Sequence, residues 1–196
     1  MKQVELKNTF FRLFDGMYST KKFGIPEAFN NFDPLDIPDE GYQKQLIPIY
    51  FRKLKNEGPL PDFVCTNICG RICSPKLKNT IHKHLTEADS EIQWLPMIIE
   101  DEGTGDKLEY YYLHFPKICD TLDMQHSTFS RHSGLVERVV FSYKKTCNRS
   151  IFNCPGSRVI LACSKELKEA IFKAGCTGIS VEPANVIQLV EEKRIL

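Results

Sequence analysis

Three evenly spaced cysteines form the most distinctive motif of the sequence: Cys65, Cys69 and Cys73 stand four residues apart. Thiolates bind zinc and iron–sulfur clusters, so the triplet is a candidate metal site. However, Val, Ile, Thr and Cys are frequent here, which predicts a strand over residues 63–73. Successive cysteines of such a strand share one face but lie about 13 Å apart, too far for one metal ion. We therefore expect packed thiols and no cofactor, with a metal-binding protein or enzyme using this triplet as the alternative.

A second group of reactive residue types lies within a short stretch of chain: His114, Asp120, Asp123, His126 and Ser127. Ser, His and Asp can form a hydrolytic triad. The sequence has no G-x-S-x-G nucleophile elbow, and it also lacks a phosphate-binding loop and a dinucleotide fingerprint. Asp and Ser equally stabilise turns in loops, which is the interpretation we favour. No enzymatic activity is predicted.

Charge is unevenly distributed along the chain. Residues 100–109 hold five acids and one lysine, whereas a basic stretch contains Arg131, Arg138, Lys144, Lys145 and Arg149. Alternation along a strand places Tyr111 on the face opposite its two tyrosine neighbours, and an exposed tyrosine beside acids is typical of protein interfaces. A charged stretch can also be a solvated surface. We predict a partner-binding surface formed by Glu100, Asp101, Glu102, Asp106, Glu109 and Tyr111, together with Asp120 and Asp123 in the following loop.

The composition is that of an ordinary globular protein. The 196 residues are 42% hydrophobic and 26% charged, which excludes collagen-like, coiled-coil and wholly disordered chains. With 26 basic and 25 acidic residues the net charge is +1, so general nucleic-acid binding is not expected. We find no signal peptide and no apolar run of the about 18 residues that a membrane span needs. These observations predict a cytoplasmic protein with reduced thiols and no membrane partner.

Local patterns predict an α+β fold, mostly antiparallel sheet with two or three packed helices. Residues 1–62 are rich in Pro and acids and are expected to be a loop-rich segment, followed by one compact domain over residues 63–196. Ser74-Pro75 and Ser164 are typical helix starts, and the spacing after Pro183 favours a last helix. Strands are expected over residues 63–73, 92–99, 108–115, 135–143, 151–153, 158–162 and 177–181, with a hairpin turn at residues 100–106.

The two helix starts belong to an internal repeat. Cys73-Ser74-x-x-Leu77-Lys78-x-x-Ile81-x-Lys83 matches Cys163-Ser164-x-x-Leu167-Lys168-x-x-Ile171-x-Lys173. Each copy follows a β-rich run. Two explanations remain open: two pseudo-equivalent strand–helix lobes, or two independent helix starts that share common capping residues.

The order of several short motifs suggests a family. They are Pro61-Asp62-Phe63, Cys73-Ser74, Gln93-Trp94-Leu95-Pro96, Tyr112-Leu113-His114-Phe115, Asp120-Thr121-Leu122-Asp123, Ser127, Ile151-Phe152, the helix from Ser164 and Ala174-Gly175-Cys176-Thr177-Gly178-Ile179. This order resembles a family of bacterial immunity proteins from polymorphic toxin systems, over roughly residues 61–182. The resemblance implies a non-enzymatic protein that binds a toxin encoded by a neighbouring gene and blocks its active site or substrate access. The cysteine triplet and the first sixty residues have no counterpart in it.

Overall fold

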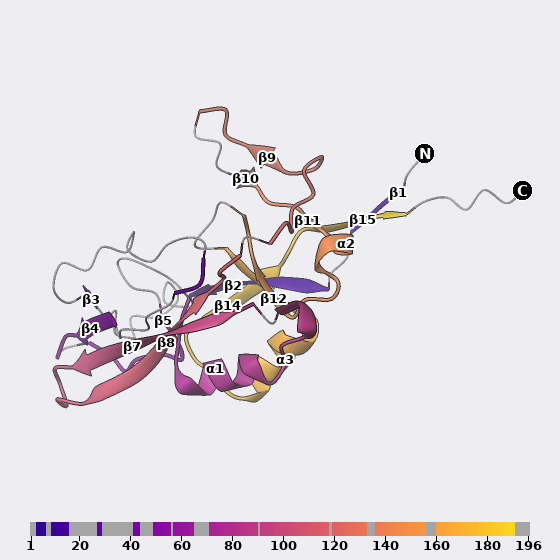
Figure 1. Ribbon diagram of the computed structural model, residues 1–196. Coiled ribbons are helices and arrows are strands. Elements are labelled where there is room, and N and C mark those ends of the chain that lie inside the picture. The colour runs from indigo at the N-terminus through magenta and orange to yellow at the C-terminus, as the bar shows by residue number, and fades with distance from the viewer. Residues whose placement is uncertain are drawn as a thin grey trace, which may run out of the picture.

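The computed structural model describes residues 3–6, 9–15, 27–28, 41–43, 49–55, 57–64, 71–89, 91–117, 119–132, 136–155 and 160–190 (Figure 1). The helices are α1 (Pro75–His82), α2 (Tyr143–Thr146) and α3 (Lys165–Lys173), with a 3-10 turn at Glu87–Asp89. The strands are β1 (Gln3–Leu6), β2 (Phe10–Asp15), β3 (Glu27–Ala28), β4 (Ile49–Lys53), β5 (Phe63–Val64), β6 (Ile72–Cys73), β7 (Gln93–Asp101), β8 (Lys107–His114), β9 (Thr128–Phe129), β10 (Val136–Arg138), β11 (Phe141–Ser142), β12 (Ile151–Asn153), β13 (Leu161–Ser164), β14 (Ile179–Pro183) and β15 (Val186–Val190). The predicted α+β class with mostly antiparallel sheets is confirmed. Within the described ranges, no helix is long and apolar enough to cross a membrane.

Strand pairing divides most of these elements into two units with the same strand order. The hairpin unit has the order β3-β4-β7-β8-β6-β5, and α1 follows β6. The terminal unit has the order β14-β2-β13-β12, and α3 follows β13. β14 continues into β15, and β1 leads into β2. β1 and β15 pair with each other, and β11 pairs with β15 in parallel as β4 does with β7. The two units differ mainly in connection, because the terminal unit takes the equivalent of β8 from the beginning of the chain.

The strand registers of the two units match residue by residue. Four pairs of the hairpin unit have equivalents in the terminal unit: Phe63↔Cys73 and Ile151↔Cys163, Cys73↔Tyr111 and Cys163↔Phe11, Pro96↔Tyr111 and Pro183↔Phe11, and the parallel Phe51↔Ile99 and Phe141↔Val186. Independent helix starts would not produce matching registers in the strands around them. The repeat in the sequence is therefore part of two pseudo-equivalent lobes.

The two long helices begin in the same way. Ser74 and Ser164 are the N-caps, both with extended backbone, and each hydroxyl accepts a hydrogen bond of 3.2 Å from the N–H three residues later. This contact satisfies one of the free N–H groups of the first helical turn. In α1, Pro75 adds a preset helical φ at the first position. The local signals in the sequence thus predict both helix starts correctly.

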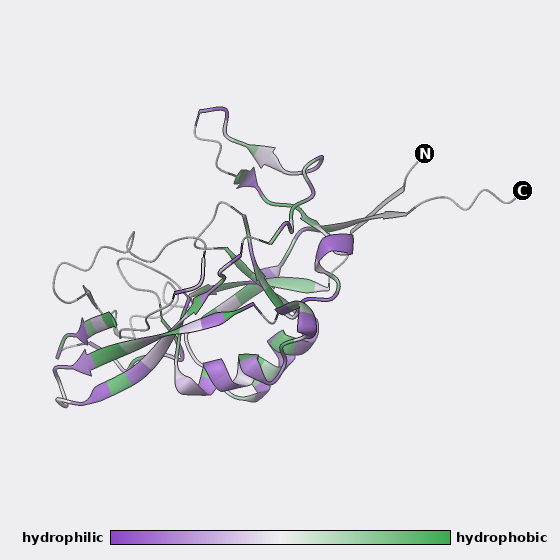
Figure 2. Cartoon of the chain, viewed as in Figure 1, coloured by the Kyte–Doolittle hydropathy of each residue, from purple (hydrophilic) through white to green (hydrophobic). Residues whose placement is uncertain are grey.

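The core of the molecule lies between the two units. A central cluster contains equivalent side chains from both: Leu113 and Leu13, Phe63 and Ile151, Cys73 and Cys163, Leu77 and Leu167, Ile81 and Ile171. Each unit also has an outer cluster of its own, on the other face of its sheet. Figure 2 shows hydrophobic residues on the strands and hydrophilic residues along the outer sides of α1 and α3. Each buried Leu or Ile contributes roughly 1.5–3 kcal/mol to the free energy of folding. The central cluster is therefore the main hydrophobic contact between the units.

Asp62 connects the two units by hydrogen bonds. Its carboxylate accepts from the Ser74 hydroxyl at 2.6 Å, from the Thr177 N–H at 2.8 Å and from the Lys76 ammonium at 3.2 Å. Burial alone would raise the pKa of Asp62, but these hydrogen bonds lower it below its ordinary value. The loop after α1 is tied to the terminal unit in return, since the Ser150 N–H donates to the Asp89 carboxylate at 2.8 Å.

The expectation of an irregular N-terminal segment is wrong for Gln3–Leu6 and Phe10–Asp15, which are strands. Ile49–Lys53 is a strand too, within residues 46–54, where the sequence pattern left strand and helix both open. β2 lies between β13 and β14, with Phe10 in one apolar cluster and Leu13 in another. A strand covered on both faces loses the alternation of polar and apolar residues by which strands are recognised. Residues 16–26, 29–40 and 44–48 of the segment lie outside the described residues. The domain boundary at residue 62 stays a prediction. Strand pairing groups the elements differently, because β2 pairs within the terminal unit and β3 and β4 pair within the hairpin unit.

Three further elements differ from the predictions. Residues 63–73 are not one strand, because β5 and β6 pair with each other as antiparallel neighbours. The strand predicted over residues 135–143 is divided into β10 and β11, and α2 begins at Tyr143. The predicted helix after Pro183 is wrong, because Val186–Val190 is β15. Pairing with β1 and β11, both distant in the sequence, outweighs the helical spacing of these apolar residues.

Gly178 tests the close approach of the two units. Its φ is +76°, and an added Cβ would lie 2.7 Å from the carbonyl oxygen of Phe63 and against the ring of Pro61. We expect Gly178→Ala to lower the free energy of unfolding by roughly 2–4 kcal/mol, the sum of backbone strain and overpacking. Gly105→Ala is the matched control, since Gly105 has φ +79° but no atom within 4 Å of the added Cβ. Equal losses in urea unfolding for both variants would contradict the close approach.

Asp62 should make stability depend on acid pH. Its pKa is lowered in the folded state, so the unfolded state binds more protons, and stability is lost as pH falls through the folded pKa. Asp62→Asn should cost roughly 2 kcal/mol at pH 7 and should show a smaller loss of stability between pH 6 and pH 3 than the unsubstituted protein. Urea unfolding at both pH values measures this difference. A variant with the same acid sensitivity as the unsubstituted protein would contradict the role of the carboxylate.

Candidate partner-binding surface

The predicted hairpin is present and extends beyond the helices. β7 and β8 pair over their length, and Figure 1 shows their turn projecting past α1. The turn closes because Asp101 N–H donates to the Asp106 carbonyl at 2.9 Å and Gly105 takes a left-handed φ of +79°. All residues from Glu102 to Glu109 are exposed. The hairpin therefore presents most of the predicted acidic residues to solvent.

Asp101 is the exception within the hairpin, because its carboxylate is used inside the fold. It forms an ion pair with Lys53 of β4 at 2.9 Å, and the Lys53 side chain is only 6% exposed. Its other oxygen accepts the Gly103 N–H at 2.8 Å. The hydrogen bond from Lys53 is the largest cause of the lowered pKa of Asp101. Burial acts in the opposite direction and raises the pKa, but by less. Asp101 thus joins the turn to the neighbouring strand.

The other acids of the hairpin have fewer internal partners. Glu102 forms a half-exposed ion pair with Arg52 at 3.1 Å. Glu109 accepts a hydrogen bond of 3.3 Å from the Tyr111 hydroxyl. For the side chains of Glu100 and Asp106, no ion pair is found among the residues that the structure describes. Negative charge therefore remains available at this end of the sheet.

Tyr111 lies on the face of the sheet that α1 partly covers. The Lys78 ammonium lies 3.4 Å from the centre of its ring, a cation–π contact. Burial and the neighbouring Glu109 both raise the pKa of Tyr111. The terminal unit has the equivalent contact, Lys168 over Phe11 at 3.7 Å. Tyr111 differs from Phe11 by its hydroxyl and by the acid beside it.

Asp120 and Asp123 lie away from the hairpin. Asp120 pairs with Lys145 of α2 at 2.8 Å, and α2 lies at the opposite end of the molecule from the β7–β8 turn (Figure 1). Asp123 accepts from two backbone N–H groups, those of Gln125 and His126, and from the His126 ring at 2.9 Å. Burial by itself would raise the pKa of Asp123, but these hydrogen bonds lower it. The structure does not bring these two residues together with the hairpin acids.

The Ser, His and Asp side chains do not assemble into a triad. The Ser127 hydroxyl donates to the Val140 carbonyl and accepts from the Val140 N–H, both at 3.1 Å. His114 is 3% exposed, and its Nε2 lies 2.9 Å from the Gly41 carbonyl oxygen. His126 bonds to Asp123 within one turn. These contacts support the loop interpretation of the cluster.

Cys73 is the one member of the cysteine triplet inside the described residues, and Cys65 and Cys69 lie outside them. The Cys73 side chain is fully buried, and burial raises the pKa of its thiol, which disfavours a thiolate ligand. Burial likewise raises the pKa of Cys163 to about 12. Over the described ranges, no group of three His, Cys, Asp or Glu side chains could hold a metal ion.

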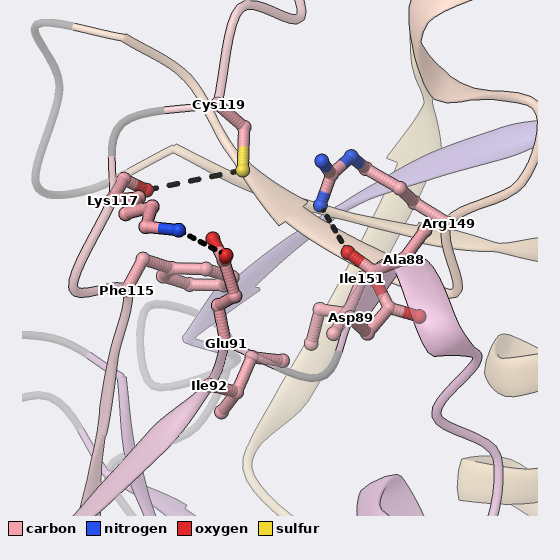
Figure 3. Close-up of a pocket in the computed structure, with 9 residues that line it drawn as sticks. All are labelled: Ala88, Asp89, Glu91, Ile92, Phe115, Lys117, Cys119, Arg149 and Ile151. Carbon is pink, nitrogen blue, oxygen red and sulfur yellow. Dashed lines mark hydrogen bonds and ion pairs between the residues drawn. The ribbon is translucent and has the colours of Figure 1, made fainter.

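A small pocket lies where the loop after α1 meets the terminal unit (Figure 3). It is lined by Ala88, Asp89, Glu91, Ile92, Phe115, Lys117, Cys119, Arg149 and Ile151. Its charged groups are paired, Glu91 with Lys117 and Arg149 with the Ala88 carbonyl at 2.6 Å. The free volume of about 10 Å³ is room for one water molecule, which is too little for a substrate.

Comparison with known protein families shows to which family the chain belongs. A model of the immunity protein family Imm11 matches residues 21–186. The chain belongs to this family. No curated protein matches it. The family match confirms the resemblance seen in the motifs and extends it, since residues 21–60 also have a counterpart in the immunity protein family.

Sequence analysis missed residues that lie beside the predicted hairpin. Tyr50 and Arg52 of β4 share a face with Ile98 and Glu100 of β7, in the parallel pairs Tyr50↔Ile98 and Arg52↔Glu100. Their segment lies within residues 46–54, where the sequence pattern left strand and helix both open, and parallel pairing between distant segments leaves no local signal. The alternation Tyr50, Phe51, Arg52 was the available hint, because Phe51 alone of the three is buried.

Two hairpin acids should behave differently when neutralised. Asp101→Asn leaves Lys53 nearly buried without its partner, so we expect a loss of about 1–3 kcal/mol in the free energy of unfolding. Asp106→Asn, at an exposed position of the same turn, should stay within about 0.5 kcal/mol. Urea unfolding of both variants measures the difference. A stable Asp101→Asn protein would show that the ion pair does not hold the turn.

Proposed function

We propose that this immunity protein binds the domain of a cognate toxin, encoded by a neighbouring gene, and covers its active site. The family match over residues 21–186 carries the proposal. The projecting hairpin supports it, since a rigid two-stranded element beyond the body of a protein can reach a concave site. In this proposal the protein works by occlusion in the cytoplasm and performs no chemistry on the toxin.

The proposed contact residues are those hairpin side chains that remain accessible: Glu100, Glu102, Asp106, Glu109 and Tyr111. Asp101, Asp120 and Asp123 are mainly used for ion pairs and turns within the chain, so we propose them only as contributors to the local negative field. A stable complex of this kind buries about 1,200–2,000 Å² and depends on a few anchors. Aromatic and charged residues side by side fit that requirement.

Titration calorimetry with the toxin domain tests the proposal. The last roughly 150 residues of the neighbouring gene's product, the size of one domain, serve as the titrant. We expect one-to-one binding with a Kd in the nanomolar range, and co-expression should restore growth that the toxin domain alone arrests. No binding at micromolar concentrations would contradict the proposal. Metal content of protein purified without oxygen would then test the alternative based on Cys65, Cys69 and Cys73.

A further inference from the structure

The part of β8 nearest the hairpin turn has a free edge. β6 pairs with β8 only from Tyr111 onward, and on that side the Leu113 N–H donates to the Arg71 carbonyl at 2.9 Å. The backbone groups of a strand alternate in direction, so the N–H and C=O groups of Lys107 and Glu109 point to the same side. Among the described residues, no strand pairs with them there.

The terminal unit shows a hydrogen bond that is missing at this edge. Lys165, the first residue of α3, donates its N–H to the Thr9 carbonyl at 3.1 Å. By the matched registers of the two units, Glu109 is the counterpart of Thr9. The counterpart of Lys165 is Pro75, which has no N–H to donate. The start of α1 therefore cannot bond to β8 as the start of α3 bonds to the chain at Thr9.

The side chains along this edge are accessible. Lys107, Leu108 and Glu109 are all exposed, and Leu108 is 37% exposed although it is apolar. Leu108 pairs with Ile99 of β7, which is completely buried. An apolar side chain on an added strand would lie beside Leu108 and extend this apolar row across the sheet. The charges of Lys107 and Glu109 cancel, so the edge as a whole favours neither sign of charge.

A second copy of this chain fits the edge poorly. Two identical β8 strands related by a two-fold axis and centred on Leu108 would place Asp106 of one copy opposite Tyr110 of the other. The register of β6 already places Ser74 there. Centring the pair on Lys107 would bring two lysines directly opposite each other, which is unfavourable. The strand of a different protein has neither constraint, because it can leave the sheet before it reaches Tyr110.

We propose that an extended strand at the edge of the cognate toxin domain pairs with Lys107–Glu109 and lengthens the sheet of the hairpin unit. The inference rests on the proposed function and specifies how the projecting hairpin engages its partner (Figure 1). Backbone hydrogen bonds give such a contact its affinity, and the alternating side chains give it specificity. The toxin strand presents an apolar side chain to Leu108.

Amide hydrogen exchange, measured residue by residue by NMR, tests the edge without any substitution. In the free protein the Lys107 and Glu109 amides should exchange fast, whereas the Leu108 and Tyr110 amides, which point to β7, should exchange slowly. The toxin domain should slow exchange at Lys107 and Glu109 about tenfold or more. Unchanged exchange at both residues in a complex that does form would overturn the inference and leave the proposed function standing.

A proline variant tests the same edge by affinity. Lys107→Pro removes one outward N–H, a change that edge strands tolerate. We expect toxin binding to weaken about tenfold to 100-fold, because a buried acceptor on the toxin strand loses its donor. Val4→Pro is the matched control, since the Val4 N–H points away from β15 at the edge of the other unit. Equal binding by both variants, with thermal unfolding showing both folded, would contradict strand pairing at β8.

The remaining outcomes separate the occupant from the function. Slow exchange at Lys107 and Glu109 in the free protein at millimolar concentration, becoming fast on dilution, would show that a second copy covers the edge and would overturn the inference. If the unsubstituted protein and the toxin domain form no complex, the proposed function fails and this inference fails with it.

Discussion

The constraint on which this structure depends is that neither unit can bury its inner face alone. Each unit is a small, mostly antiparallel sheet with one helix of eight or nine residues, and helices of that length are marginal without tertiary packing. Leu77 and Ile81 of α1 and their equivalents in α3 are buried in one shared cluster. The loop after each helix also bonds to the other unit. The two units must therefore fold together.

The structural difference between the units lies outside this shared core. Equivalent strands, caps and cation–π contacts repeat, but Val140 of the terminal unit is buried whereas its counterpart in the hairpin unit, Tyr50, is 49% exposed. The closed hairpin at residues 101–107 stands where the terminal unit has the two chain ends. A duplicated architecture can thus supply stability from both halves while the surfaces of the two halves differ.

The number of acids in the sequence does not show which of them keep an unpaired charge. Asp101 and Asp120 are acids like Glu100 and Asp106, yet each is paired with a lysine, Asp101 largely buried and Asp120 exposed. Glu100 and Asp106 keep their charge available in the described part of the chain. The distinction depends on where Lys53 and Lys145 lie, and both come from other elements. Membership in an immunity protein family gives this difference its meaning, because only accessible acids can meet a partner.

Local sequence patterns predict both Ser-capped helices, the β7–β8 hairpin and the repeat. Their signals are contained within about ten residues, because caps, turns and amphipathic spacing act between near neighbours. Tertiary structure decided that Phe10–Asp15 is a central strand and that Val186–Val190 is a strand rather than a helix. It also determines which acids are paired with a lysine and that Tyr50 lies beside Ile98. These outcomes follow from pairing between distant segments, which no local pattern encodes.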